Sequence, residues 1–213
     1  MGELRELARF VHDLTWEALP ETARQTAVFR TLDLVSVAMG AVKDSLVQSV
    51  LDSYRQRSET GICSVWGMDQ FLPMAEAAKV NAMLAHTLEL DDVHTASKTH
   101  GSASIIPAAW ACGEQLGSTG REFLLAAVCG YEVTARIGMA LGVTAHRKKG
   151  WHATATCGVF GCAAAAAKLL GLTEDETVSA LGMAGTQSAG LWAFLGDGAS
   201  CKVLPPAPAA ACG

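Results

Sequence analysis

Apolar residues recur along most of the chain at the three- and four-residue spacing of an α-helix. Half of the residues are hydrophobic but only 6% are aromatic, so Ala, Leu, Val, Met and Cys must supply most of the core. Such small side chains favour closely packed helices over sheets. The pattern therefore predicts an all-α protein of about eight helices, at residues 3–13, 20–39, 45–54, 73–89, 102–116, 120–141, 159–171 and from 174 onward.

Capping boxes mark the starts of two of these helices. Thr119 with Glu122, and Thr173 with Glu176, have the Thr-x-x-Glu spacing in which each side chain bonds the other residue's backbone N–H. The segment GICSVWG, residues 61–67, is the one stretch with the composition of a strand. We therefore expect at most one brief strand.

The C-terminal stretch differs from the rest of the chain. The sequence VLPPAPAAACG is rich in Pro and Ala, which predicts an irregular tail over residues 205–213. The expected domain organisation is a helical domain at residues 1–204 followed by that tail.

Composition argues against several classes of function. The formal net charge of -5 offers no basic face for nucleic acid. The uncharged stretch from Thr177 to Gly196 is too polar and glycine-rich for a membrane span, and the N-terminus lacks the apolar segment of a signal peptide. Seven cysteines at scattered spacings, without a C-x-x-C pair, argue against a structural zinc site and indicate a reducing, cytoplasmic compartment.

Charged residues gather at the junctions between apolar helices. Residues 88–103, LELDDVHTASKTHGSA, contain Glu89, Asp91, Asp92, His94, Lys98 and His100. Residues 145–158, AHRKKGWHATATCG, contain His146, Arg147, Lys148, Lys149 and His152. A smaller pair further along the chain is Asp197 and Lys202. In both large junctions a histidine is followed by a helix start of small residues, whose free backbone N–H groups suit an anion.

Three interpretations of these junctions are open from the residues alone. Asp92, His94 and His100 could ligate a divalent metal, but their spacing matches no motif of known geometry. A second possibility is proton transfer beside carboxylates, where cations absorb the developing negative charge; the residues suited to it are His100, His152, Lys98, Arg147 and Lys202. The junctions could also be solvated loops whose histidines only cap or pack. Phosphate-loop and nucleophile-elbow motifs are missing from the sequence.

Three longer segments carry a specific resemblance. THGSASIIPAAWACGE, GWHATATCGVFGCAAAAAKLLGL and AGTQSAGLWAFLGDGASCKVL resemble the MmgE/PrpD family, and the similarity runs from about residue 5 to residue 204. That family includes 2-methylcitrate dehydratase, cis-aconitate decarboxylase and related enzymes that act on small polycarboxylates. The resemblance implies a helical first domain, a smaller α+β second domain, a homodimer, and acid–base chemistry without a metal or cofactor.

The resemblance also implies which residues form the site. The implied catalytic residues are His100, His152, Asp91 and Asp92. The implied substrate-binding residues are Lys202, Glu89, His94 and Thr99. The two histidines would exchange a proton at carbon, one of the aspartates would orient a histidine or anchor the loop, and the lysine would meet a substrate carboxylate.

The chain departs from the family pattern after Lys202. The pattern continues roughly as K-x-L-H-x-G-x-A-A, whereas this sequence has Pro205 and Ala207 in place of the histidine and the glycine. Family members are longer, and a frameshift, a truncated gene or a deliberately shortened product would each explain the difference. The leading hypothesis is a lyase for small polycarboxylates, by 2-methylcitrate dehydration or cis-aconitate decarboxylation. The alternative is a helical remnant that binds a carboxylate or pairs with another copy without turnover.

Overall fold

Helices make up nearly all of the regular structure in the computed structural model, which describes residues 2–57, 59–196 and 198–213. The α-helices of these residues are α1 (Gly2–Asp13), α2 (Glu21–Gly40), α3 (Ser45–Gln56), α4 (Met74–Thr87), α5 (Gly101–Leu116), α6 (Gly120–Ala140), α7 (Val143–Lys148), α8 (Ala153–Leu169), α9 (Glu174–Thr186) and α10 (Pro206–Cys212). Two short 3₁₀ helices are η1 (Ala193–Leu195) and η2 (Ser200–Val203). The all-α prediction is confirmed.

The predicted helix starts are also confirmed where caps can be tested. In both capping boxes the threonine hydroxyl accepts a hydrogen bond from the glutamate backbone, and the glutamate accepts one from the threonine backbone. The strand prediction is half right. The segment GICSVWG contains β1 (Cys63–Ser64), but β1 pairs in an antiparallel manner with a second short strand, β2 (Phe71–Leu72), which the pattern does not reveal.

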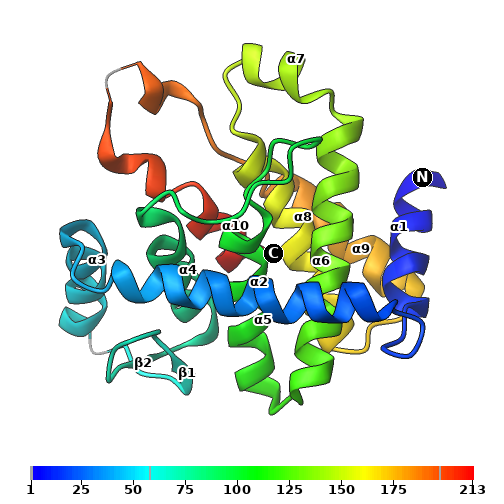
Figure 1. Cartoon of the computed structure of the whole chain (residues 1–213), viewed down its shortest axis with the longest axis horizontal. Helices are drawn as coiled ribbons and strands as arrows, with labels where there is room; N and C mark the ends of the chain where they lie inside the picture. Colours follow the sequence, from blue (N-terminus) through cyan, green and yellow to red (C-terminus); the bar gives the residue numbers. More distant parts are fainter. Residues whose placement is uncertain (1, 58, 197) are drawn as a thin grey trace.

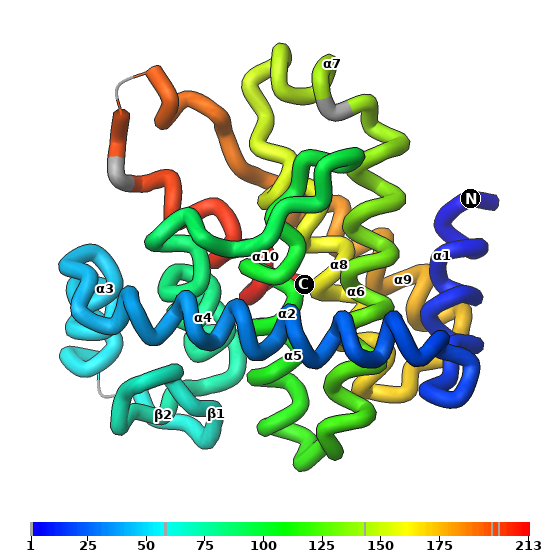
Figure 2. Tube along the Cα trace, in the orientation of Figure 1, coloured from blue at the N-terminus to red at the C-terminus, as the bar shows by residue number. Residues whose placement is uncertain are grey.

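Helix α8 lies at the centre of the molecule and packs against α5, α6, α9 and α10. Helix α2 runs along the face seen in Figure 1, with α3 near one end and α1 beside α9 at the other. The tube in Figure 2 shows three long loops reaching the same side of the molecule, at the top of the view. They are residues 88–100, the region around α7, and residues 187–205. These loops contain the charged junctions found in the sequence.

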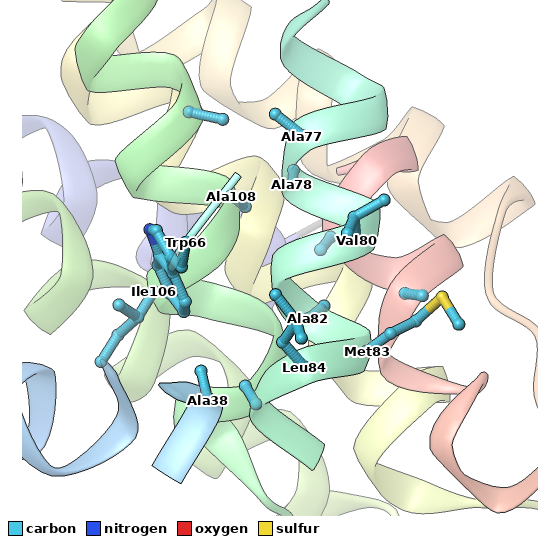
Figure 3. Close-up of a cluster of buried hydrophobic side chains, with 14 of the residues drawn as sticks. Ala38, Trp66, Ala77, Ala78, Val80, Ala82, Met83, Leu84, Ile106 and Ala108 are labelled. Atoms are coloured by element: carbon cyan, nitrogen blue, oxygen red, sulfur yellow. The ribbon is translucent and has the colours of Figure 1, made fainter. Parts of the chain in front are cut away.

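The main core is built on α4, whose sequence is buried over most of its length. Figure 3 shows its small and aliphatic side chains packed beside Trp66, the largest residue of the cluster. The indole of Trp66 meets that of Trp110 edge to face at 5.4 Å, and Trp110 meets Phe123 in the same way at 5.6 Å. These three aromatic residues thus form a contact chain within an otherwise alanine-rich core.

Glycines allow the central helices to touch through their backbones. A Cβ added to Gly161 of α8 would lie 2.6 Å from the carbonyl oxygen of Gly130 on α6, and one added to Gly130 would lie 2.8 Å from the carbonyl oxygen of Gly161. One turn earlier on α8, a Cβ on Gly158 would lie 2.7 Å from Ser104 Oγ of α5. Larger residues at these positions would push α5 and α6 away from α8.

Helix α6 is long and apolar enough, by length and composition, to span a membrane, and the bent pair α2 and α3 passes the same test when taken together. Both findings concern only the described residues. The side chains of Ala126, Cys129 and Val133 on α6 are buried within the domain, and α6 packs along α8. This placement is that of a core helix.

The prediction of an irregular tail over residues 205–213 is wrong. Residues Pro206–Cys212 form α10, and Ala207 and Ala209 are buried against α4 and α8. Proline is well tolerated in the first turn of a helix, where its missing N–H has no intrahelical partner to bond. Alanine is the strongest helix former. The helical domain therefore continues to the last described residue.

Candidate active site

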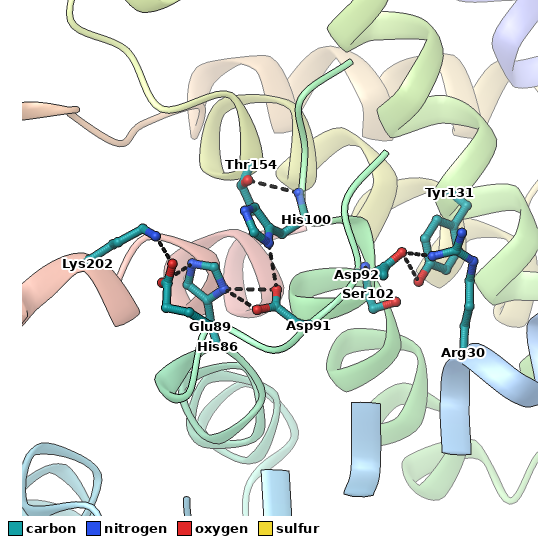
Figure 4. A network of polar contacts seen from close by, with 10 residues as sticks. All are labelled: Arg30, His86, Glu89, Asp91, Asp92, His100, Ser102, Tyr131, Thr154 and Lys202. Carbon is teal, nitrogen blue, oxygen red and sulfur yellow. Dashed lines mark hydrogen bonds and ion pairs between the residues drawn. The ribbon is translucent and has the colours of Figure 1, made fainter. Parts of the chain in front are cut away.

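Side chains from five parts of the chain converge beside the N-terminal ends of α5 and α8. His86 comes from the last turn of α4, and Asp91 from the loop that follows it. His100 and His152 are the N-cap residues of α5 and α8, and Lys202 lies in η2. Figure 4 shows all of these except His152, together with their contacts.

Asp91 is held by two histidines. His86 Nδ1 lies 2.9 and 3.0 Å from its two carboxylate oxygens, and His100 Nδ1 lies 3.1 Å from Oδ2. Burial raises the Asp91 pKa, but hydrogen bonds from His100 and His86 outweigh that effect and lower the pKa to about 2. The carboxylate is therefore charged at neutral pH and fixes both Nδ1 atoms as donors. His100 is left with an Nε2 lone pair when its ring is neutral.

Glu89 joins this group to Lys202. Lys202 Nζ forms an ion pair with Glu89 Oε2, and Glu89 Oε1 lies 3.5 Å from His86 Nε2. Glu89 directly follows Leu88, the C-cap of α4, and has a φ of 55°. Glycine usually occupies this left-handed position, because other residues are strained there. We call Lys202, Glu89, His86, Asp91 and His100 the acid–base network.

His152 lies in a more apolar part of the site. Its ring stacks on Trp192 with centroids 4.8 Å apart and meets the edge of Phe194 at 5.5 Å. Burial, followed by the nearby His86, His100 and Arg147, lowers the His152 pKa to about 3. His152 is therefore neutral at pH 7 and offers a base or a hydrogen-bonding group there, not a cation.

The two predicted helix starts lie side by side. The backbone N–H of His100 donates to Thr154 Oγ1 at 3.0 Å, which ties the start of α5 to the first turn of α8. Neither helix has a side-chain cap at its N-terminus. The N-terminal ends of the two helices thus lie together, where their dipoles favour negative charge, and in α5 the Ser102 N–H already bonds the Asp92 carboxylate.

Asp92 points away from the histidines. Its carboxylate forms an ion pair with Arg30 of α2 and accepts hydrogen bonds from the Tyr131 hydroxyl at 3.4 Å and the Ser102 N–H at 3.1 Å. Figure 4 shows this group on the opposite side of the loop from Asp91. Of the two predicted aspartates, Asp91 contacts the histidines, and Asp92 anchors the loop to α2, α5 and α6.

His94 and Thr99 also lie on the Asp92 side of the loop. His94 Nδ1 contacts Ser97 Oγ at 2.8 Å, Ser97 Oγ contacts Thr99 Oγ1 at 2.7 Å, and the His94 N–H donates to the Thr99 carbonyl at 2.9 Å. Together with Asp92 they line a cavity of about 330 Å³ against α2 and α6. The structure therefore separates these two predicted substrate-binding residues from Lys202 and Glu89.

The other charged residues of the junctions lie further from the histidines or outside the described residues. Lys98, Lys148 and Lys149 have exposed side chains. Arg147 covers a face of Trp192 at 4.4 Å, and its charge is one of those that lower the His152 pKa. Asp197 lies outside the described residues.

The structure also changes the candidate metal ligands. The sequence left Asp92, His94 and His100 open as possible metal ligands, but the Asp92 and His94 side chains lie apart from His100. The one group of the described residues with suitable donors is His86, Asp91 and His100, whose ligand atoms lie within 4.8 Å of one another. Both Nδ1 atoms already bond Asp91 directly, so hydrogen bonds account for this geometry.

Sequence reasoning missed His86 and Thr154. His86 stands alone in an apolar helical run, outside both charged junctions, and reads as a packed core residue. One signal could have found it. A histidine in the last turn of a helix lies near an acidic residue that follows the helix end, here Asp91.

The helical fold thus places two histidines on one buried carboxylate beside the starts of α5 and α8. Residues 5–213 match the MmgE/PrpD N-terminal domain, and the chain belongs to the MmgE/PrpD family. It is 31% identical over 195 residues to cis-aconitate decarboxylase of Aspergillus terreus, an alignment that covers 89% of this chain and 40% of that protein. It is 33% identical over 205 residues to cis-aconitate decarboxylase-like protein oryM of Aspergillus oryzae, covering 91% and 42%.

A mammalian relative gives a similar picture. The chain is 30% identical over 183 residues to cis-aconitate decarboxylase of Mus musculus, with 83% of this chain and 37% of the relative covered. The chain therefore spans about two fifths of the length of the curated relatives it matches.

Proposed function

We propose that this chain functions in a lyase reaction on small polycarboxylates. The reaction proceeds by proton transfer at carbon, without a metal or cofactor. The observation that carries the proposal is the acid–base network, in which a histidine held by a buried carboxylate is linked to a lysine. Decarboxylation of cis-aconitate is the leading reaction, because similar proteins bear that name. Dehydration of a 2-methylcitrate-like acid is the other reaction that the same groups could support.

The proposed proton carrier is His100. In a decarboxylation the bond between carbon and CO₂ breaks, its electron pair stays on the carbon skeleton, and a proton must reach carbon. Protonated His100 supplies that proton from Nε2, while anionic Asp91 stabilises the imidazolium through Nδ1. In a dehydration the neutral ring removes a proton, and hydroxide leaves from the neighbouring carbon.

The proposed substrate-binding groups are a lysine, the N-terminal ends of two helices and a histidine. Lys202 would share its ammonium between Glu89 and a substrate carboxylate. The dipoles at the adjoining N-terminal ends of α5 and α8 also favour a carboxylate. His152 Nδ1 has no hydrogen-bond partner among the described residues, so it can bond a substrate oxygen.

The test is direct turnover. The chain is incubated with cis-aconitate, and the release of CO₂ and of the five-carbon unsaturated diacid is measured. A matched series compares the parent chain with His100→Gln and with His12→Gln, a change at an exposed histidine of α1. Turnover in the parent and the His12 variant, with a loss of about 100-fold or more in the His100 variant, is expected. Equal turnover in all three would refute the assignment.

A second candidate is carboxylate binding without turnover. The observation that favours it is the low pKa of His152, which leaves this histidine unable to act as an acid at neutral pH. Thermal unfolding with and without cis-aconitate separates the possibilities. A rise in Tm with no CO₂ release indicates a binder, whereas neither response indicates a helical remnant.

Two further proposals concern assembly and compartment. Exposed Phe29 and Leu32 on α2, at 67% and 59% exposure, support pairing with a second copy as a homodimer. Sedimentation of the parent chain beside Phe29→Ser tests this pairing. All seven cysteines are free thiols, which supports a reducing, cytoplasmic compartment. Fractionation of cells that produce the protein tests that location.

A further inference from the structure

We propose that His86 is a positioning residue that couples the carboxylate-binding end of the site, Lys202 and Glu89, to its proton-transferring end, Asp91 and His100. The inference rests on the proposed function and assigns a role to a residue outside the charged junctions. His86 need not touch substrate for this role, because it acts through the two carboxylates on either side of its ring.

The first argument is the burial of His86. Its side chain is fully buried, and its neighbours Met83, Leu84 and Ala85 on α4 are buried apolar residues. An imidazole in such surroundings is unfavourable unless its nitrogens are bonded, and packing alone would be served by an apolar side chain. The hydrogen bond to Asp91 gives the imidazole the partner that its burial requires.

The second argument is the geometry at Asp91. His100 contacts only Oδ2, so that bond alone would let the carboxylate rotate. His86 Nδ1 lies near both oxygens, at 2.9 and 3.0 Å, and this contact fixes the plane of the carboxylate. The rings of His86 and His100 meet edge to face at 4.9 Å, with 74° between their planes. His86 thus holds Asp91 in the orientation that keeps the proton of His100 on Nδ1.

The third argument is the opposite side of the ring. His86 Nε2 lies 3.5 Å from Glu89 Oε1 and has no hydrogen-bond partner in the part of the chain that the structure describes. Glu89 is strained, with a φ of 55°, and its other oxygen binds Lys202. A substrate carboxylate that draws Lys202 toward itself would free Glu89 to accept a hydrogen bond from Nε2 of a His86 ring protonated on both nitrogens. Binding of a substrate carboxylate at Lys202 would then change the hydrogen bonding at Asp91 through the His86 ring.

Two amide variants separate the two ends of the ring. In His86→Asn the amide nitrogen takes the place of Nδ1 and keeps the bond to Asp91, while the contact with Glu89 is lost. In His86→Gln the amide nitrogen takes the place of Nε2 and keeps the Glu89 side, while Asp91 loses its second donor. His12→Gln is the matched control on the surface.

The main readout is the ¹⁵N spectrum of the histidine rings, which shows directly which nitrogen carries the proton. In the parent chain, His86 and His100 should both carry it on Nδ1. His100 should keep that single form in His86→Asn and become a mixture of both forms in His86→Gln. Where turnover is present, kcat should fall about 10- to 100-fold in His86→Gln. In His86→Asn, KM should rise and kcat should stay within about twofold.

The ¹⁵N spectra test the positioning role of His86 independently of turnover. A parent spectrum with the His100 proton on Nε2 would overturn it without any variant. An unchanged His100 spectrum in a folded His86→Gln variant would overturn it as well, and would make His86 a purely structural residue. If the spectra change as expected but the parent chain turns over neither cis-aconitate nor 2-methylcitrate, the proposed function fails and the positioning role of His86 stands.

Discussion

Replacing Asp91 with Asn keeps the size of the side chain and removes the charge that holds two histidines. The Asp91 pKa is about 2 in the folded protein, against an ordinary value of 3.8. At about 1.4 kcal/mol per pH unit, this difference corresponds to about 2 kcal/mol of stability. Because the pKa is lowered by folding, the contribution is complete above the ordinary value and is lost as pH falls through the folded value. About half of it should be left at pH 3.

The assay is urea unfolding of the parent chain and Asp91→Asn at several pH values between 7 and 3. The variant should be less stable by about 2 kcal/mol at pH 7. In Asn the amide N–H₂ replaces one carboxylate oxygen and would face the His86 N–H in either orientation of the amide, so the true loss at neutral pH is at least this large. Toward pH 3 the difference should shrink by about 1 kcal/mol.

Asp92→Asn is the matched control, because it neutralises the adjacent carboxylate, whose partners are Arg30, Tyr131 and a backbone N–H. This variant should lose stability while leaving the His100 ¹⁵N spectrum unchanged. A difference between the parent and Asp91→Asn that is the same at pH 7 and pH 3 would refute the reasoning. The loss of stability would then come from the altered packing and hydrogen bonding of the side chain and not from its lost charge.

Further predictions concern the other parts of the site and the core. Folding lowers the His152 pKa to about 3 from 6.5, so between these pH values the unfolded chain binds more protons than the folded one. Stability should therefore decrease as the pH is lowered through this range. His152→Asn should flatten that slope, of up to about 1.4 kcal/mol per pH unit, in unfolding curves at pH 7 and 5, and an equal slope in both proteins would contradict the assignment. Lys202→Ala should raise the calorimetric Kd for cis-aconitate roughly 10- to 100-fold, because a charge-assisted hydrogen bond contributes about 1.5–3 kcal/mol. The exposed Lys43→Ala should not change it, and equal Kd values for the two variants would remove the lysine from the site. Ala207→Leu should lower stability in urea by about 1–3 kcal/mol, because α10 leaves no room at this fully buried position. A neutral effect would mean that α10 does not pack as described.

The sequence predicts the helices well because their apolar spacing and caps are local signals. The α10 helix is missed because proline-rich composition suggests disorder, whereas burial of Ala207 against two other helices depends on the fold. The paired aspartates show a similar limit. Adjacent residues of an extended loop point to opposite sides, so the sequence cannot tell which of Asp91 and Asp92 faces the histidines.

The site itself could be predicted only in part, for related reasons. His100, His152 and Lys202 stand out as charged or polar residues at helix starts and loops, and the structure brings them to one side of the domain. His86 does not stand out, because its partner lies beyond the end of its own helix and is reached only when the loop folds back.

The contacts between Gly130 and Gly161, and between Ser104 and Gly158, have an evolutionary consequence. An added side chain has little room where the Gly130 and Gly161 backbones meet, or where the small Ser104 side chain fits against Gly158. Enlargement there therefore moves a whole helix. The starts of α5 and α8 carry His100 and His152, and their separation is set by these contacts. Sequence changes that reshape the site while the two histidines keep their places are therefore expected in the three loops.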